Sequence, residues 1–173
     1  MACLMTAYYD SNQLDSSNVY ADKIIGHGTA APDALNKGQL YKGKVAYQKK
    51  DYDVAQDYFL MCLNGAKDVS AAEAHYLLAK IQYDKKQYKQ SIETLYDFNN
   101  TYSSYEVWLG KSFLLIAENF IAKDELFQAR ETLNSIVEKS PNADIKKQAR
   151  ERLEQLNALE ATKNQSKEGV GNE

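Results

Sequence analysis

The chain has 173 residues, of which 44% are apolar, and its 24 acidic and 21 basic side chains give a net charge of −3. This apolar content is enough to bury the core of one domain or of a short repeat array. The balanced charge excludes a basic surface for nucleic acid or an anionic membrane, and no apolar run reaches the roughly 18 residues of a membrane span.

One short phrase occurs twice in the first half of the chain. Residues 45–59 read VAYQKKDYDVAQDYF, and residues 81–95 read IQYDKKQYKQSIETL. Both contain a tyrosine, a double lysine and a second tyrosine at the same offsets. Apolar residues follow at helical spacing, and only two prolines interrupt the whole chain, so we predict an all-helical protein. Self-similarity at a fixed period also predicts a repeated structural unit.

The repeat register extends over four units, each marked by one small residue. These residues are Ser17, Ala55, Ser91 and Ala129, and twelve positions earlier the units have Met5, Gly43, Ala79 and Ala117. Small residues that face each other allow two antiparallel helices to approach closely, while large apolar residues one turn away close the pair. We therefore predict helix pairs within residues 1–31, 32–69, 70–105 and 106–141.

The two ends of the chain differ in pattern. Residues 144–161 have one apolar stripe and charged residues elsewhere, which predicts a capping helix over 142–161. Residues 162–173 contain too few apolar residues to fold, and a disordered tail is expected there. Counting back from Ser17 places the start of the first helix before Met1. The chain is therefore expected to be the C-terminal part of a longer array.

With this register, the chain resembles the tetratricopeptide repeat family. The unit that matches the family pattern best has, in order, Phe113, Ile116, Ala117, Phe120, Leu126, Ala129, Leu133 and Pro141. Two positions depart from the pattern, because Lys42 and His75 stand where large apolar residues are usual. The resemblance implies a right-handed α-solenoid of about four helix pairs and a capping helix in one domain over residues 1–161.

The resemblance also implies a binding surface along the first helix of each pair, where the family holds extended peptides or partner helices. The residues that fall on this surface are Tyr9, Leu40, Lys44, Tyr47, Tyr76, Lys80, Tyr83, Leu114, Glu118 and Ile121. Rigid aromatic side chains beside charged ones are typical of protein-binding surfaces. In the alternative interpretation, these rings only pack between neighbouring first helices. The carboxylate clamp of co-chaperone members does not fit, because Lys44 and Lys80 replace its asparagines.

No catalytic site is predicted. His27 lies in the glycine-containing turn 26–32 and His75 on a helix face, and no nucleophile, phosphate-loop or zinc motif accompanies them. Cys3 and Cys62 lack metal-ligand spacing and are expected to be packing residues, so neither a metal nor a cofactor is expected. Trp108 is placed in a linker, where it either fills a gap between units or anchors a partner.

Two functional hypotheses follow from these patterns. In the first, the chain is a non-catalytic module that binds a protein or peptide. In the second, it is a structural module of a homo-oligomer or of a larger cell-envelope assembly. The tyrosine, asparagine and lysine content resembles that of bacterial members of the family. We therefore expect the periplasm or cell envelope if a longer parent chain carries a signal, and otherwise the cytoplasm.

Overall fold

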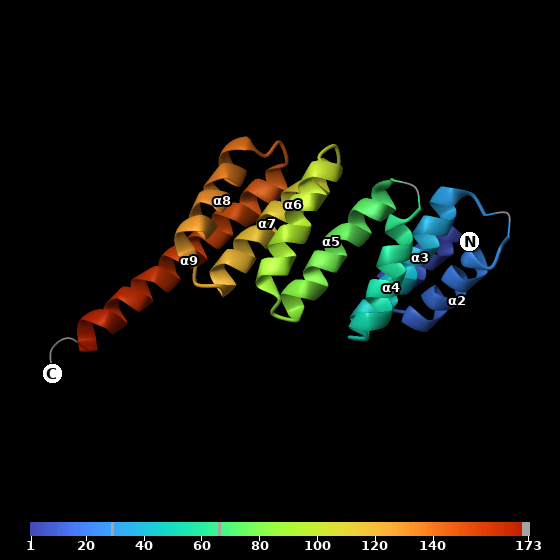
Figure 1. The fold of residues 1–173 in the computed structure, drawn as a ribbon, viewed down its shortest axis with the longest axis horizontal. Helices are drawn as coiled ribbons and strands as arrows, with labels where there is room; N and C mark the ends of the chain where they lie inside the picture. The colour runs from blue at the N-terminus through green and yellow to red at the C-terminus, as the bar shows by residue number, and fades with distance from the viewer. Residues whose placement is uncertain (29, 66, 171–173) are drawn as a thin grey trace. The chain divides into compact units, whose positions relative to one another are not determined.

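A computed structural model describes residues 1–28, 30–65 and 67–170, with the side chains of 164–170 outside the description. Within these ranges the chain forms α-helices and no β-strand (Figure 1). The helices are α1 (Ala2–Asp10), α2 (Leu14–Ile25), α3 (Pro32–Gln48), α4 (Tyr52–Leu63), α5 (Val69–Asp84), α6 (Tyr88–Thr101), α7 (Glu106–Ala122), α8 (Leu126–Lys139) and α9 (Ala143–Val170).

The helices form two compact units, Met1–Tyr105 and Glu106–Glu173. In the first unit each helix packs on the next one in the chain, and α3 also contacts both α1 and α5. In the second unit α8 packs on α7 and α9, and α7 also contacts α9. Consecutive packing of helix pairs, with neighbouring first helices in contact, is the architecture of an α-solenoid. The predicted fold class is therefore confirmed.

Several helices begin at residues suited to a helix N-terminus. Pro32 occupies the first turn of α3, where N–H groups have no acceptor within the helix, so the absence of an N–H on proline breaks no hydrogen bond. The carboxylates of Asp51 and Asp68 accept hydrogen bonds from backbone N–H groups in the first turns of α4 and α5. The Asn142 side chain does the same for Ile145 in α9. These caps satisfy N–H groups that a helix leaves unpaired.

The four small residues that define the register lie where the two helices of each pair meet. Ser17, Ala55, Ser91 and Ala129 are all 0% exposed. A Cβ atom added at Gly43 would overlap the ring of Phe59, so the second pair tolerates no side chain at that point. The predicted register is therefore confirmed by close contact at these positions.

Two of the four small residues are serines, and each one is satisfied across the helix pair. Ser17 Oγ donates to the carbonyl oxygen of Met5 at 3.0 Å, and Ser91 Oγ donates to that of Ala79 at 2.8 Å. Each acceptor lies twelve residues before its donor, on the facing helix. A buried hydroxyl without such an acceptor would destabilise the fold. Serine can therefore replace alanine where the two backbones approach this closely.

The turn inside each helix pair contains one residue with left-handed backbone geometry. Asn12, Lys50, Lys86 and Asp124 have φ angles of 59°, 61°, 60° and 63°, and each lies five residues before its pair's small residue. The following residue donates its N–H to a carbonyl five positions back, as in Gln87 to Gln82 at 2.8 Å. This bonding pattern ends the first helix and turns the chain into the second.

The double lysine of the repeated phrase has two separate structural roles. The second lysine, Lys50 or Lys86, takes the left-handed position in the turn. The first, Lys49 or Lys85, reaches the second helix of the preceding pair, and its ammonium group lies 2.8 Å from Asp15 or 2.9 Å from Asp53. These ion pairs are exposed, so each contributes little to stability.

The structure differs from the sequence predictions at two places. Trp108 lies within α7 and not in a linker, and the Lys111 ammonium lies 4.1 Å from its ring centroid. The single domain over 1–161 stays a prediction, and the division into two compact units falls at the predicted boundary between the third and fourth helix pairs. Residues 162–170 of the expected tail continue α9, and residues 171–173 lie outside the described residues. Extending an existing helix needs no new nucleus, which favours helix over coil in this polar segment.

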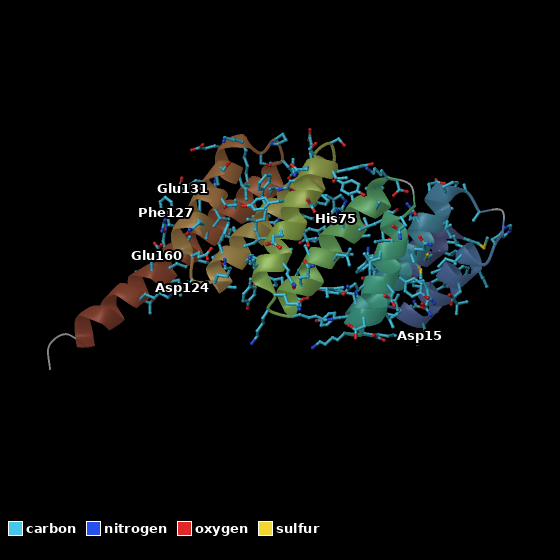
Figure 2. The ribbon with its side chains drawn as sticks, viewed as in Figure 1. Asp15, His75, Asp124, Phe127, Glu131 and Glu160 are labelled. Carbon is cyan, nitrogen blue, oxygen red and sulfur yellow. The ribbon has the colours of Figure 1, made fainter. Side chains whose placement is uncertain are left out.

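Leu133 tests the core of the second unit. Its side chain is 0% exposed inside a cluster with Ala117, Ala129 and Ile136, so Leu133→Ala should reduce the free energy of unfolding by about 2–5 kcal/mol. Phe127 on the same helix is 72% exposed, and Phe127→Ala should change it by less than about 0.5 kcal/mol (Figure 2). Urea unfolding followed by circular dichroism measures both. Equal losses would contradict the register.

Lys86 tests the left-handed turn. Glycine adopts positive φ without steric cost, so Lys86→Gly should raise the free energy of unfolding by up to about 1 kcal/mol. Lys86→Ile places a β-branched residue at the same φ of 60° and should lower it. Thermal unfolding of the two variants gives the comparison, and the reverse order of stability would show that this turn does not constrain the helix pair.

Candidate protein-binding surface

The first helices of the first unit lie next to one another, with α3 in contact with α1 and α5. Their half-buried polar and aromatic side chains form the surface that we call the tyrosine–lysine face. We define it by Tyr9, Lys44, Tyr47, Glu73, Tyr76, Lys80, Tyr83 and Asp84, all of which keep part of their surface exposed. Six of these eight residues were predicted for the binding surface, and Glu73 and Asp84 were not.

Lys44 is the centre of one cluster on this face. Its ammonium group lies 4.6 Å from the ring centroids of Tyr9 and Tyr41, and 2.7 Å from Glu73 Oε1. Burial lowers the pKa of Lys44, but the adjacent Glu73 carboxylate more than compensates and leaves it above its usual value. The charged amine therefore links α1, α3 and α5 through two rings and one carboxylate.

The Tyr9 ring is fixed by further contacts. It meets Tyr41 edge to face at 5.3 Å, and Gln48 Nε2 donates to its hydroxyl oxygen at 2.9 Å. Burial raises the pKa of Tyr9, partly opposed by Lys44 and by the Gln48 hydrogen bond. The ring is therefore packed against α3, and Tyr9 is only partly buried.

Asp84 is the centre of a second cluster. It accepts a hydrogen bond from the Tyr47 hydroxyl at 2.6 Å and one from the Lys80 ammonium at 2.7 Å. Lys80 also lies 4.5 Å from the ring centroid of Tyr83. Burial, together with Asp84, raises the pKa of Tyr47 far above its usual value, so this tyrosine remains a hydrogen-bond donor. The Tyr47–Asp84 bond joins α3 to α5.

The tyrosines were interpreted either as a binding surface or as packing between neighbouring first helices, and their contacts are compatible with both. The rings at Tyr9 and Tyr47 pack between neighbouring first helices, as the structural alternative expected, but they also keep an exposed side. Leu40 differs from the prediction. It is 2% exposed, so its side chain belongs to the core and is inaccessible to a partner. Tyr76 is half-buried on α5.

The remaining predicted residues belong to the second unit. Leu114 and Ile121 are partly buried against that unit's hydrophobic cluster, and Glu118 forms an ion pair with Arg152 of α9. These contacts give the three side chains structural roles within their unit. A continuous row from Tyr83 to Ile121 would run from one unit to the other and stays a prediction.

His75 and Cys62 lie in packed environments, whereas His27 and Cys3 do not, so the prediction of a packing role is wrong for Cys3. His75 lies at the contact of α5 and α6, where its ring meets Phe98 and Tyr102 edge to face at 5.9 and 5.8 Å (Figure 2). His27 is exposed in the turn before α3. Burial raises the pKa of the Cys62 thiol to about 12, whereas Cys3 is exposed. Among the described residues, no group of three or more histidine, cysteine or acidic side chains could hold a metal ion.

The comparison with protein families identifies the repeat. The tetratricopeptide repeat family model matches residues 111–143, which cover most of α7, all of α8 and the start of α9. This segment is similar to a tetratricopeptide repeat. The match falls on the unit with the most complete family pattern, and a search of the curated proteins found no match.

A repeat of this kind suggests a protein–protein interaction module, and tetratricopeptide repeats are typically non-catalytic. The same helix-pair arrangement also occurs outside the matched segment. The pairs α3–α4 and α5–α6 are joined by the turns that contain Lys50 and Lys86. None of the helices in the described part of the chain is both long and apolar enough to cross a membrane.

His75 makes stability depend on pH. Burial lowers its pKa, with partial opposition from the Asp97 charge, so the unfolded chain binds a proton more readily than the folded one. The contribution of neutral His75 to stability should therefore be complete above about pH 6.5 and decrease as the pH falls below it. His75→Phe should reduce this dependence.

The measurement is urea unfolding at pH 7.5 and pH 5.5, with His27→Gln as the exposed control variant. The wild type should lose more stability between these pH values than His75→Phe. Identical losses in the two proteins would exclude His75 as the source.

Proposed function

We propose that this protein binds a partner protein through the tyrosine–lysine face of α1, α3 and α5, and that it does so without catalysis. The partner contributes an extended peptide or a helix. The proposal is carried by the fixed geometry of the face, because Tyr47 and Lys80 are both held by Asp84, and Tyr9 and Lys44 are held by α3 and α5. Rings already fixed before binding lose little entropy when a partner is bound.

The charges of the face indicate what kind of segment would bind. Lys44 is paired with Glu73 and Lys80 with Asp84, so each cation already has a carboxylate within 2.7 Å. A bare carboxylate on a partner would have to displace an existing ion pair. We therefore propose a segment of mixed polarity that contacts the rings with apolar groups and hydrogen-bonds at their edges, and not a simple acidic terminus.

The test begins with a random peptide library displayed on phage and selected on the wild-type chain. Selected peptides are then titrated by fluorescence anisotropy against wild type and the double variant Lys80→Gln, Tyr83→Ala. Loss of both groups should raise the Kd about tenfold or more, the effect expected for hot-spot residues.

The matched control uses the same pair of residue types on α2. Lys23 lies 4.8 Å from the Tyr20 ring centroid, as Lys80 does at 4.5 Å from that of Tyr83. Lys23→Gln, Tyr20→Ala should leave the Kd within about twofold, provided that circular dichroism shows both variants folded. Equal weakening by the two variants, or none, would contradict binding at this face.

A structural role in a homo-oligomer is the second candidate, favoured by apolar side chains on the second helices. Val19 on α2 and Val54, Leu60 and Met61 on α4 are 49%, 42%, 44% and 50% exposed. Light scattering coupled to gel filtration would show a mass that increases with concentration under this role. A monomer mass at all concentrations would exclude self-assembly.

A further inference from the structure

A polar groove lies between second helices of the pairs, whereas the tyrosine–lysine face lies on the first helices. It runs between the second helices α4 and α6, which both pack on α5 and, in the described part of the chain, make no contact with each other. The resulting cavity has a volume of about 530 Å³ and lies entirely within the first unit. Its lining includes Gln56, Gln82, Lys85, Gln90, Glu93 and Asp97.

Gln82, which lines the groove, has a hydrogen-bond acceptor that no described residue satisfies. Gln82 extends from α5, and its Oε1 atom is buried without a hydrogen-bond partner. An unpaired buried carbonyl oxygen is unfavourable, so a group that donates a hydrogen bond to it would gain free energy. Gln56 from α4 and Gln90 from α6 supply further amide groups on the two walls.

The wall formed by α6 is acidic. Glu93 and Asp97 lie one helical turn apart, and both are exposed. The Lys89 ammonium approaches Glu93 only to 3.9 Å in a pair that is largely exposed, and Asp97 forms no ion pair with a described residue. The one cation that lines the groove, Lys85, is already paired with Asp53 at 2.9 Å. The groove therefore favours a positively charged ligand.

We propose that this groove binds an arginine side chain on a segment of a partner protein. The guanidinium group is always charged, has five N–H donors and no acceptor, and can bridge a carboxylate and the Gln82 carbonyl oxygen once that side chain turns toward the groove. A lysine ammonium offers a single point of charge and spans this set of acceptors less well. Leu60, 44% exposed and one turn after Gln56 on α4, offers apolar surface to the arginine stem or to a neighbouring apolar residue.

The surface is independent of the tyrosine–lysine face, because its residues come from the second helices and from the side of α5 that carries Gln82. A partner could occupy one surface while the other remains free. The proposal therefore adds a second point of attachment to the same unit, and its failure would leave the proposed function untouched.

The test is an NMR titration of the full chain with three capped, alanine-based peptides that each carry one leucine. The first has two arginines, the second has two lysines, and the third has two citrullines, which keep the shape of arginine but lack its charge. The arginine peptide should shift the side-chain amide signals of Gln56, Gln82 and Gln90. Its Kd should be about tenfold lower than that of the citrulline peptide, as expected for loss of a charge-assisted hydrogen bond.

Variants assign the effect to the groove. Gln82→Met keeps the side-chain length and removes the buried acceptor, and Asp97→Asn removes one charge; each should weaken binding of the arginine peptide several-fold. Asp57→Asn, an equivalent change at an exposed α4 residue outside the groove, is the control and should have no effect. Amide spectra of the free variants verify that each is folded.

Three results would overturn the proposal. One is equal binding of the arginine and citrulline peptides, or no shift up to millimolar peptide. Another is equal binding of the arginine and lysine peptides, which would remove the guanidinium assignment. The last is a set of shifts confined to α1, α3 and the Tyr83 side of α5, which would place the peptide on the tyrosine–lysine face.

Discussion

The close approach of two helix backbones within each pair is the constraint on which the rest of the structure depends. It requires a side chain no larger than serine at residues 17, 55, 91 and 129, all of which are fully buried. Where serine is present, its hydroxyl must find an acceptor, and the facing carbonyl twelve residues earlier provides it. At Gly43 the ring of Phe59 occupies the space that any side chain would need.

The tyrosine–lysine face follows from this packing. Within the first unit, α3 contacts both α1 and α5, and long polar side chains meet along these contacts. Tyr47 of α3 bonds to Asp84 of α5, and Lys44 of α3 pairs with Glu73 of α5. Under the proposed function, the residues that hold neighbouring repeats together are also those that a partner would contact, so stability and recognition would depend on the same side chains.

The parts of the fold that could be predicted are those determined within one helix pair. The small residues, the turns and the apolar stripes recur at a fixed spacing, so Ser17 and Ala129 could be assigned from the sequence without knowledge of distant contacts. The ion-pair and hydrogen-bond partners of the surface residues could not be predicted from the sequence. Glu73 and Asp84 are ordinary acidic residues in the sequence, and only the packing of α3 on α5 brings them to Lys44 and Tyr47.

Two other differences have related causes. Leu40 shares its register position with Tyr76, but the repeat pattern does not say which of them is covered by neighbouring helices, and the structure buries Leu40. The repeat pattern places a boundary between helix pairs at 105/106, but the spacing of the small residues does not mark it as a division between compact units. Trp108 was misplaced because the turn before it is shorter than the polar segment suggested: α6 ends at Thr101 and α7 begins at Glu106.

The bridges from Lys49 to Asp15 and from Lys85 to Asp53 have an evolutionary consequence. Each bridge joins a turn to the second helix of the preceding pair, so the second pair carries the acidic half of one bridge, Asp53, and the basic half of another, Lys49. Duplication of such a repeat in the gene would produce a new copy whose two ends match both neighbours without further mutation. At the position equivalent to Asp15 and Asp53, the third pair has Lys89, and Lys123 in the following turn pairs with Glu125 instead. Unequal recombination could thus lengthen the array freely within the first pairs, but a repeat copied across this position would bring two lysines to one joint.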